Sequence, residues 1–214
     1  MKILRRLKYG RLLRQKHPAR YANLFRTIVD RRCRHIVEIG TWNGVHAEQM
    51  ISTAAIHADV AEVSYRGFDL FEELTEEQYK AEFSKRPPSS AEVQARLEKT
   101  GADVRLVKGN TRVTLPKHAD ELRRADLVFI DGGHSIETIT ADWNAVRQAV
   151  GPKTTVLFDD YYVNQASAVE GLGCQSIIDA LDRSRYEVEV LDPVDEFPKP
   201  WGTLKVRMAR VRAR

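Results

Sequence analysis

The sequence predicts an α/β fold: a Rossmann-like, doubly wound sheet of seven strands, one of which is antiparallel. Three observations lead to this prediction. Short apolar runs of strand length recur along the chain, segments with helical periodicity separate most of them, and the alternation breaks near the end of the sequence. Strands that alternate with helices form parallel sheets that carry helices on both faces.

Five apolar runs are the candidate parallel strands. Gly, Asn or Asp stands at or near the end of each run, which is typical of buried parallel strands. The runs span residues 35–40, 63–71, 104–110, 126–133 and 154–160. Helical patterns lie between several of them, at residues 44–58, 91–101 and 136–151. We therefore expect the carboxyl ends of the five strands to meet at one edge of the sheet.

Two further strand-like runs follow, at residues 186–192 and 203–211. Only residues 193–202 separate them, and this linker is too short for a helical crossover. The two runs should therefore pair as an antiparallel hairpin, which gives the sheet its one reversed strand.

Composition predicts one domain in a reducing compartment. The chain has 214 residues, 43% of them hydrophobic, which is enough for a single core. It has no apolar run of membrane-spanning length, and its first residues lack the apolar segment of a signal peptide. Two cysteines, Cys33 and Cys174, form no CxxC pattern, which argues for the cytoplasm and against a disulfide scaffold or a zinc site.

Basic residues concentrate at the two ends of the sequence. Residues 1–20 carry eight Lys or Arg and no acid, and residues 205–214 carry five and no acid, so the part between them is net acidic. We assign residues 1–18 to a basic N-terminal arm and residues 19–214 to the domain. An acidic body does not suit a nucleic-acid groove. The arm is a candidate for contact with anionic lipid or RNA, or it is a solvated helix or frayed tail.

The first strand runs into a glycine-containing turn with an acid before it. Glu38, Gly40, Thr41 and Gly44 belong to this E-I-G-T-W-N-G segment, and the two glycines allow a ligand to approach the backbone closely. The spacing is G-x-x-x-G, without the middle glycine of the dinucleotide fingerprint, and Glu38 would repel a pyrophosphate. The turn therefore disfavours a nicotinamide cofactor and suits a cationic amino-acid group.

Polar residues also end the second and third strands. Asp69 is placed to accept the hydroxyl groups of a ribose, although an isolated acid at this position is more often a strand-end cap. Gly109 and Asn110 could line an adenine pocket, and a simple turn explains them equally well.

Three carboxylates follow the fourth and fifth strands. Asp131 ends one run, Asp159 and Asp160 end the next, and neighbouring strands would bring the three together. Crowded carboxylates repel unless a cation neutralises them, and hard oxygen ligands suit Mg²⁺ or Mn²⁺. His134, three residues after Asp131, could serve as a general base or could cap a helix.

Together these motifs resemble class I S-adenosylmethionine-dependent methyltransferases, and more narrowly the macrocin-type O-methyltransferases of sugars and small molecules. The resemblance rests on E-I-G-x-x-x-G, the acid after the second strand, F-I-D-G-x-H-S and F-D-D-Y, and it covers residues 30–195. Macrocin-type relatives are often longer, whereas this chain has only a short N-terminal arm.

The resemblance implies a role for each matching residue. Asp131, Asp159 and Asp160 match the family's divalent-metal ligands, with Mg²⁺ as the expected ion, and His134 and Asp131 are the expected catalytic residues. S-adenosylmethionine would be held by Glu38, Gly40, Thr41, Gly44, Asp69, Gly109, Asn110 and Asp131.

The leading hypothesis is therefore a Mg²⁺-assisted O-methyltransferase that acts on a sugar, glycan or phenolic hydroxyl. The alternatives are an RNA methyltransferase that uses the basic arm, and a module that binds S-adenosylmethionine without turnover. We expect a small-molecule or glycan acceptor rather than nucleic acid as the partner. Peripheral membrane contact through the arm and assembly into a homo-oligomer are left open.

Overall fold

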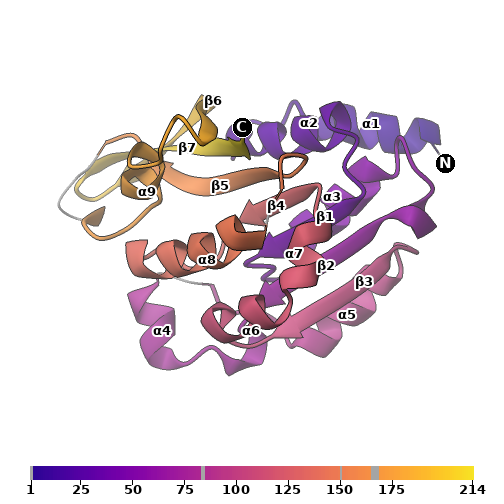
Figure 1. Cartoon of the computed structure of the whole chain (residues 1–214), viewed down its shortest axis with the longest axis horizontal. Helices are drawn as coiled ribbons and strands as arrows, with labels where there is room; N and C mark the ends of the chain where they lie inside the picture. The colour runs from indigo at the N-terminus through magenta and orange to yellow at the C-terminus, as the bar shows by residue number, and fades with distance from the viewer. Residues whose placement is uncertain (1, 83–84, 150, 165–168) are drawn as a thin grey trace.

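The computed structural model describes residues 2–82, 85–149, 151–164 and 169–214, and its centre is one seven-stranded sheet (Figure 1). The strand order is β3-β2-β1-β4-β5-β7-β6. The bounds are β1 His35–Ile39, β2 Ser64–Asp69, β3 Asp103–Lys108, β4 Leu127–Ile130, β5 Thr155–Tyr162, β6 Tyr186–Lys199 and β7 Gly202–Ala213. β1 to β5 are mutually parallel, and β7 is antiparallel to both of its neighbours, so the predicted fold class is confirmed.

The register brings the carboxyl ends of the parallel strands together. Ile39 lies opposite both Phe68 of β2 and Ile130 of β4, and Ile130 lies opposite Phe158 of β5. The residues that follow these positions therefore share one edge of the sheet, as the alternation of strands and helices predicts.

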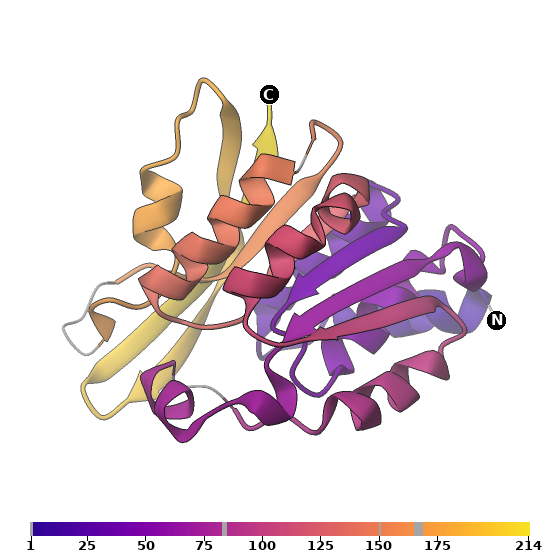
Figure 2. The same cartoon turned by 60° about the horizontal axis from the view of Figure 1, so that its bottom comes forward.

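Helices cover both faces of the sheet (Figures 1 and 2). One face packs against α1 Lys2–Leu12, α2 Ala22–Asp30, α3 Val45–Ala54 and α5 Ser90–Glu98. The other face packs against α6 Thr111–Lys117, α7 Ala119–Arg124, α8 Ile136–Ala149 and α9 Gln175–Asp179. Because side chains alternate along a strand, Ile36 packs in the first core and Val37 in the second. Both faces are apolar, which explains why the strands read as continuous hydrophobic runs.

The remaining short elements lie near the carboxyl edge or in connections. They are α4 Glu76–Ala81, η1 Ala19–Tyr21, η2 Val60–Glu62 and η3 Phe71–Glu73. α4 and α5 each begin with a reciprocal capping box, formed by Thr75 with Gln78 and by Ser89 with Glu92. These side chains satisfy backbone N–H groups that the first turn of a helix leaves free.

The C-terminal hairpin forms as predicted, but it is longer than the sequence indicates. Pairing runs from Tyr186 opposite Ala213 to Lys199 opposite Gly202, so most of the expected linker at 193–202 is strand. The predicted linker was wrong because a proline and several charged residues in sequence, beginning at Pro193, are typical of loops. β6 is the edge strand, where prolines and charges are tolerated, and the register shifts between Leu191 and Asp195 around that proline.

The basic arm is a helix that packs on the domain. In α1, Tyr9 contacts the first core cluster, and Leu12 and the following Leu13 do the same. The Arg5 guanidinium donates a hydrogen bond to the carbonyl of Ala55 at 3.2 Å. Within the described ranges, no helix is long and apolar enough to cross a lipid bilayer.

We expect Gly40→Ala to destabilise the fold by about 3 kcal/mol or more, because no side chain fits between β1 and β4 at this position. Gly40 has φ +95°, and a Cβ there would lie 2.1 Å from the carbonyl oxygen of Asp131. Gly151→Ala is the control, since a Cβ at Gly151 meets no atom within 4 Å. Urea unfolding of both variants measures the difference, and equal stabilities would contradict this account of the turn.

Candidate functional site

A cavity of about 540 Å³ opens at the carboxyl edge of the parallel strands. Its volume is in the range of small-molecule sites. The segment that contains α4 passes beside this edge (Figure 2) and contributes Leu74, Gln78 and Glu82 to the wall. Most of the rest of the wall comes from η1, from the turns after β1 to β4, from Asp159 and Asp160 within β5, and from side chains of α3 and α8. Of the residues predicted from sequence, those that line it are Gly40, Thr41, Asp69, Asn110, Asp131, His134, Asp159 and Asp160.

Asp69 shapes two of the turns that surround the cavity. One carboxylate oxygen accepts the backbone N–H of Trp42 at 2.7 Å, and the other accepts that of Phe71 at 2.9 Å. Trp42 and Phe71 both have positive φ, near +47° and +48°, so these bonds hold turns that are costly for bulky residues. Burial raises the pKa of Asp69 above its ordinary value, and the backbone bonds oppose that shift. A carboxylate has about four acceptor positions, so Asp69 can still accept a ligand hydroxyl.

Three of the predicted cofactor residues do not line the cavity. Gly44 precedes α3 with φ +73°, and Gly109 turns the chain after β3 with φ +126°. Glu38 is fully buried in β1, where the Tyr65 hydroxyl donates a hydrogen bond to it. Burial raises the pKa of Glu38 to about 8, and its Oε1 has no partner among the described residues. Direct ligand contacts for these three residues stay predictions.

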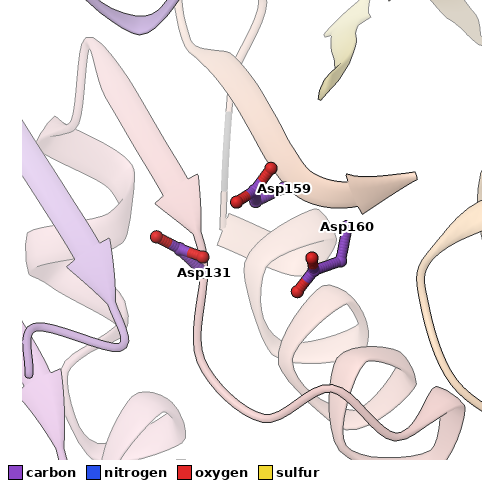
Figure 3. A group of neighbouring side chains, drawn as sticks. All are labelled: Asp131, Asp159 and Asp160. Carbon is purple, nitrogen blue, oxygen red and sulfur yellow. The ribbon is translucent and has the colours of Figure 1, made fainter. Parts of the chain in front are cut away.

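The three predicted acids come together, as the strand order requires. One oxygen from each of Asp131, Asp159 and Asp160 lies within 4.8 Å of the others (Figure 3). Successive residues of a regular strand point to opposite faces, yet Asp159 and Asp160 both reach the cavity. Asp160 has φ +58°, and the register of β5 with β7 shifts between Phe158 and Tyr161. This irregularity turns two consecutive carboxylates toward one site.

The main counter-charge of the cluster is Arg20, which the sequence analysis counted only as part of a basic run. Its Nε donates to Asp159 Oδ1 at 2.6 Å and its Nη2 to Asp159 Oδ2 at 2.7 Å. Its Nη1 reaches Asp195 Oδ2 at 3.1 Å. Burial alone would raise the pKa of Asp159, but the guanidinium, together with hydrogen bonds from the Asp160 backbone and Tyr21, holds that pKa below its ordinary value.

Tyr21 and His46 are further cavity residues that the sequence analysis missed. The Tyr21 hydroxyl lies 2.8 Å from Asp131 Oδ2 and 3.0 Å from Asp159 Oδ2, so it bridges the two acids. Its ring lies against the His46 imidazole, with centroids 4.3 Å apart. Burial lowers the pKa of His46 to about 4, so this imidazole is neutral at neutral pH. No local pattern in the sequence distinguishes these residues from ordinary core positions.

His134 lies between a backbone carbonyl and the acid cluster. Its Nδ1 contacts the Glu82 carbonyl oxygen, and its Nε2 lies 3.2 Å from Asp160 Oδ2. Burial and the neighbouring Asp159 raise the pKa of Asp160 to about 6. With Nδ1–H donating to the carbonyl, Nε2 is the nitrogen that can exchange a proton at the cavity. The geometry allows His134 to act as a base, and that role stays a prediction.

The oxygen donors of the cluster fit a divalent cation. Among the described residues, no hydrogen bond reaches Asp131 Oδ1 or Asp160 Oδ1, and Arg20 is shared between Asp159 and Asp195. Arg20 therefore pairs directly with Asp159 and Asp195 but with neither Asp131 nor Asp160. Carboxylate oxygens at such separations are the ligands that Mg²⁺ prefers.

We expect Arg20→Met to destabilise the protein by about 3–5 kcal/mol at neutral pH, because it leaves buried carboxylates without their cation. The pair contributes stability above the pKa of the unfolded carboxyl, about 4, so the loss should shrink as pH falls below that value. Arg34→Met is the control, because the Arg34–Glu62 pair is exposed and should contribute little.

Chemical denaturation at several pH values measures these differences. The double variant Arg20→Met/Asp159→Asn should recover part of the loss, since it removes one uncompensated charge. A cost for Arg20→Met no larger than that for Arg34→Met would refute the role assigned to this ion pair.

Comparisons with known proteins agree with the fold. The sequence profile of the methyltransferase domain family matches residues 37–161, which is more than half of the chain. A search of curated protein sequences finds no match. Several solved structures share the fold at low sequence identity.

One of these structures is the O-methyltransferase TomG from Streptomyces achromogenes, involved in tomaymycin synthesis and solved in complex with SAM. It is 16% identical with a TM-score of 0.57, over 89% of this chain and 78% of TomG. An O-methyltransferase from Bacillus cereus in complex with SAH is 14% identical with a TM-score of 0.58, over 96% of this chain and 90% of its own. An rRNA methylase from Streptococcus thermophilus is 10% identical with a TM-score of 0.59. The match covers 91% of this chain and 96% of the methylase.

The profile match covers the turn after β1, the strand ends at Asp69 and Asp131, and the β5 acids. The overall fold is similar to that of the compared methyltransferase structures. The chain belongs to the methyltransferase domain family and is a class I, S-adenosylmethionine-dependent methyltransferase.

Proposed function

We propose that the protein transfers a methyl group from S-adenosylmethionine to the oxygen of a small-molecule hydroxyl, on a sugar, glycan or phenol. The observation that carries the proposal is the grouping of Asp131, Asp159, Asp160 and His134 on the wall of the cavity that Gly40 and Asp69 also line. Such a grouping suits removal of a hydroxyl proton beside the methyl donor. Two of the compared structures, TomG and the Bacillus cereus protein, are O-methyltransferases.

The turns after β1, β2 and β3 are the proposed cofactor site. Asp69 would accept the ribose hydroxyls, and the Gly40–Thr41 backbone would contact the amino-acid end. Asn110, which caps α6 by accepting the Arg112 N–H at 3.0 Å, would lie beside the adenine.

Methyl transfer is an in-line displacement, so the protein contributes mainly alignment of oxygen, methyl and sulfur. His134 Nε2 would take the acceptor proton, while the Glu82 carbonyl fixes the ring through Nδ1. Tyr21 keeps its proton, because burial first and then the nearby acids raise its pKa well above the ordinary value. It can therefore orient Asp131 by donating a hydrogen bond, and it is not a base.

Asp131, Asp159 and Asp160 would hold a Mg²⁺ ion in this proposal. When bound, such an ion favours the deprotonated form of an acceptor hydroxyl. Asp131 Oδ1 and Asp160 Oδ1, which accept no hydrogen bond from the described residues, would be the main donors to such an ion, because both Asp159 oxygens already accept hydrogen bonds from Arg20.

An RNA methyltransferase is the second candidate. The rRNA methylase from Streptococcus thermophilus shares the fold, and the helix α1 is basic. Three acids grouped beside the proposed methyl site are better suited to a hydroxyl acceptor than to an RNA strand, whose phosphates they would repel. A cofactor-binding module without turnover would leave the His134–Asp160 contact without a function.

We expect S-adenosylhomocysteine to bind in isothermal titration calorimetry, and Asp69→Asn to weaken its binding about tenfold or more, because an amide offers fewer acceptor positions to the ribose. Asp182→Asn, a substitution of an exposed acid outside the cavity, is the matched control and should bind as the wild type. Absence of wild-type binding would reject the cofactor assignment, and undiminished binding by Asp69→Asn would reject the role of this residue.

We expect a chelator to reduce methyl transfer to a panel of hydroxyl acceptors, and His134→Ala to lower turnover by about 10²–10⁴-fold with cofactor affinity near normal. His57→Ala, outside the cavity, is the control. Binding of Mn²⁺ measured by electron paramagnetic resonance gives a readout independent of the acceptor, and Asp160→Asn should weaken it. Full activity in chelator, or a fully active His134→Ala, would remove the corresponding role.

A further inference from the structure

Helix α1 has a second apolar strip in addition to the one that contacts the core. Tyr9, Leu12 and Leu13 pack on the domain. Ile3, Leu4 and Leu7 are instead 76%, 65% and 64% exposed. At 100° per residue, Leu4 and Leu7 lie nearly opposite the Tyr9–Leu12 side of the helix. Exposed leucines grouped on one side of a packed helix indicate a contact surface.

Cations surround this strip. Helical spacing places Lys8 and Arg11 on the same side as Leu4 and Leu7, and both basic side chains are exposed. The acids usual on a solvated helix are missing, since α1 contains none. The exposed side therefore combines aliphatic side chains with positive charge.

A second cavity, of about 810 Å³, continues this side of α1 toward α3 and α5. The side chains of Ile51 and Val60 form an apolar part of its wall. Arg96 and Lys99 contribute two cations from a segment some ninety residues after α1 in the sequence. Glu48 is the one acid of the lining, and it is paired with Arg96 at 2.9 Å. Because Glu48 offsets the charge of Arg96, Lys99 is the net positive charge that the fold adds beside the strip.

We propose that this surface, formed by Ile3, Leu4, Leu7, Lys8, Arg11, Arg96 and Lys99, docks on the face of a bilayer that contains anionic phospholipid. The helix would lie in the interface plane, with its leucines between the lipid headgroups and its cations on the phosphates. Eleven residues measure about 16 Å, which is far short of the roughly 30 Å hydrocarbon core, so the helix docks and does not span.

The aliphatic strip favours a lipid surface over RNA. Phosphates of either ligand would attract the cations, but only a membrane removes Ile3, Leu4 and Leu7 from water. The docking surface belongs to α1 and α5 and not to the methyltransferase cavity, so this inference does not depend on the proposed acceptor or metal. Docking through this surface would place the protein at a membrane.

Vesicle co-sedimentation tests the proposal. The full chain is mixed with vesicles of phosphatidylcholine alone or of phosphatidylcholine with phosphatidylglycerol, and binding is expected only to the anionic vesicles. Lys8→Gln/Arg11→Gln should weaken partitioning about 30-fold, the equivalent of about 2 kcal/mol for two charges. Leu4→Ser/Leu7→Ser should weaken it about tenfold or more.

Matched controls separate the surface from general effects. Lys153→Gln/Arg183→Gln removes two exposed cations from other segments, and Val113→Ser/Val163→Ser removes two exposed aliphatic side chains. Both controls should bind vesicles as the wild type does. Equal thermal unfolding temperatures confirm that the α1 variants are folded, since all four side chains are exposed.

Two results would overturn the proposal. One is absence of wild-type binding to anionic vesicles. The other is vesicle binding that Leu4→Ser/Leu7→Ser leaves unchanged. A parallel titration with a fluorescent RNA oligonucleotide tests nucleic acid as the ligand. If RNA binds tightly, needs Lys8 and Arg11 but not the leucines, and vesicles do not bind, the surface would be assigned to nucleic acid.

Discussion

The buried ion pair between Arg20 and Asp159 is the contact on which the candidate site depends. Parallel strands bring their ends to one edge, and in this protein the ends of β4 and β5 carry three carboxylates. Inside a protein such charges are costly, and an uncompensated acid would take up a proton or move away. Arg20 allows Asp159 to stay ionised at the centre of the group, and the same guanidinium holds Asp195 of β6. The acid cluster and the closure of the cavity by η1 therefore arise from one interaction.

Two backbone irregularities complete the site. Gly40 permits β1 and β4 to approach at their ends, and the left-handed Asp160 turns a second carboxylate into the cavity. Both conformations are unfavourable for ordinary residues, and both occur beside the proposed chemistry. Asp69 stabilises two further unfavourable backbone conformations. Its two oxygens accept hydrogen bonds from the backbone N–H groups of Trp42 and Phe71, which both have positive φ. The unfavourable local geometry is thus supported by hydrogen bonds from a residue that also faces the cavity.

The sequence predicts those parts of the molecule that follow from strand periodicity and topology. Gly40, Asp69, Asp131 and Asp159 lie together because the carboxyl ends of parallel strands share an edge, and that rule needs no side-chain detail. The direction of Asp160 could not be predicted, because it depends on an irregularity against β7. Arg20 could not be identified within a run of eight basic residues, since its partner Asp159 lies 139 positions later. The full burial of Glu38 could not be predicted either, because the sequence carries no sign that the Tyr65 hydroxyl would donate a hydrogen bond to it.

The ion pair also limits how this chain can diverge. The segment that matches the family profile, residues 37–161, includes Asp159 but neither Arg20 nor Asp195, so the counter-charge comes from outside the shared part. A descendant that lost Arg20 in a single step would keep buried acids without a cation, and one that lost Asp159 first would keep a buried guanidinium with only Asp195. Viable descendants must therefore change the two positions together or retain both. Arg20 and Asp159 should be inherited as a pair, and a homologue recognised only over its central segment has to be checked at its N-terminal flank before the same electrostatics are assigned to it.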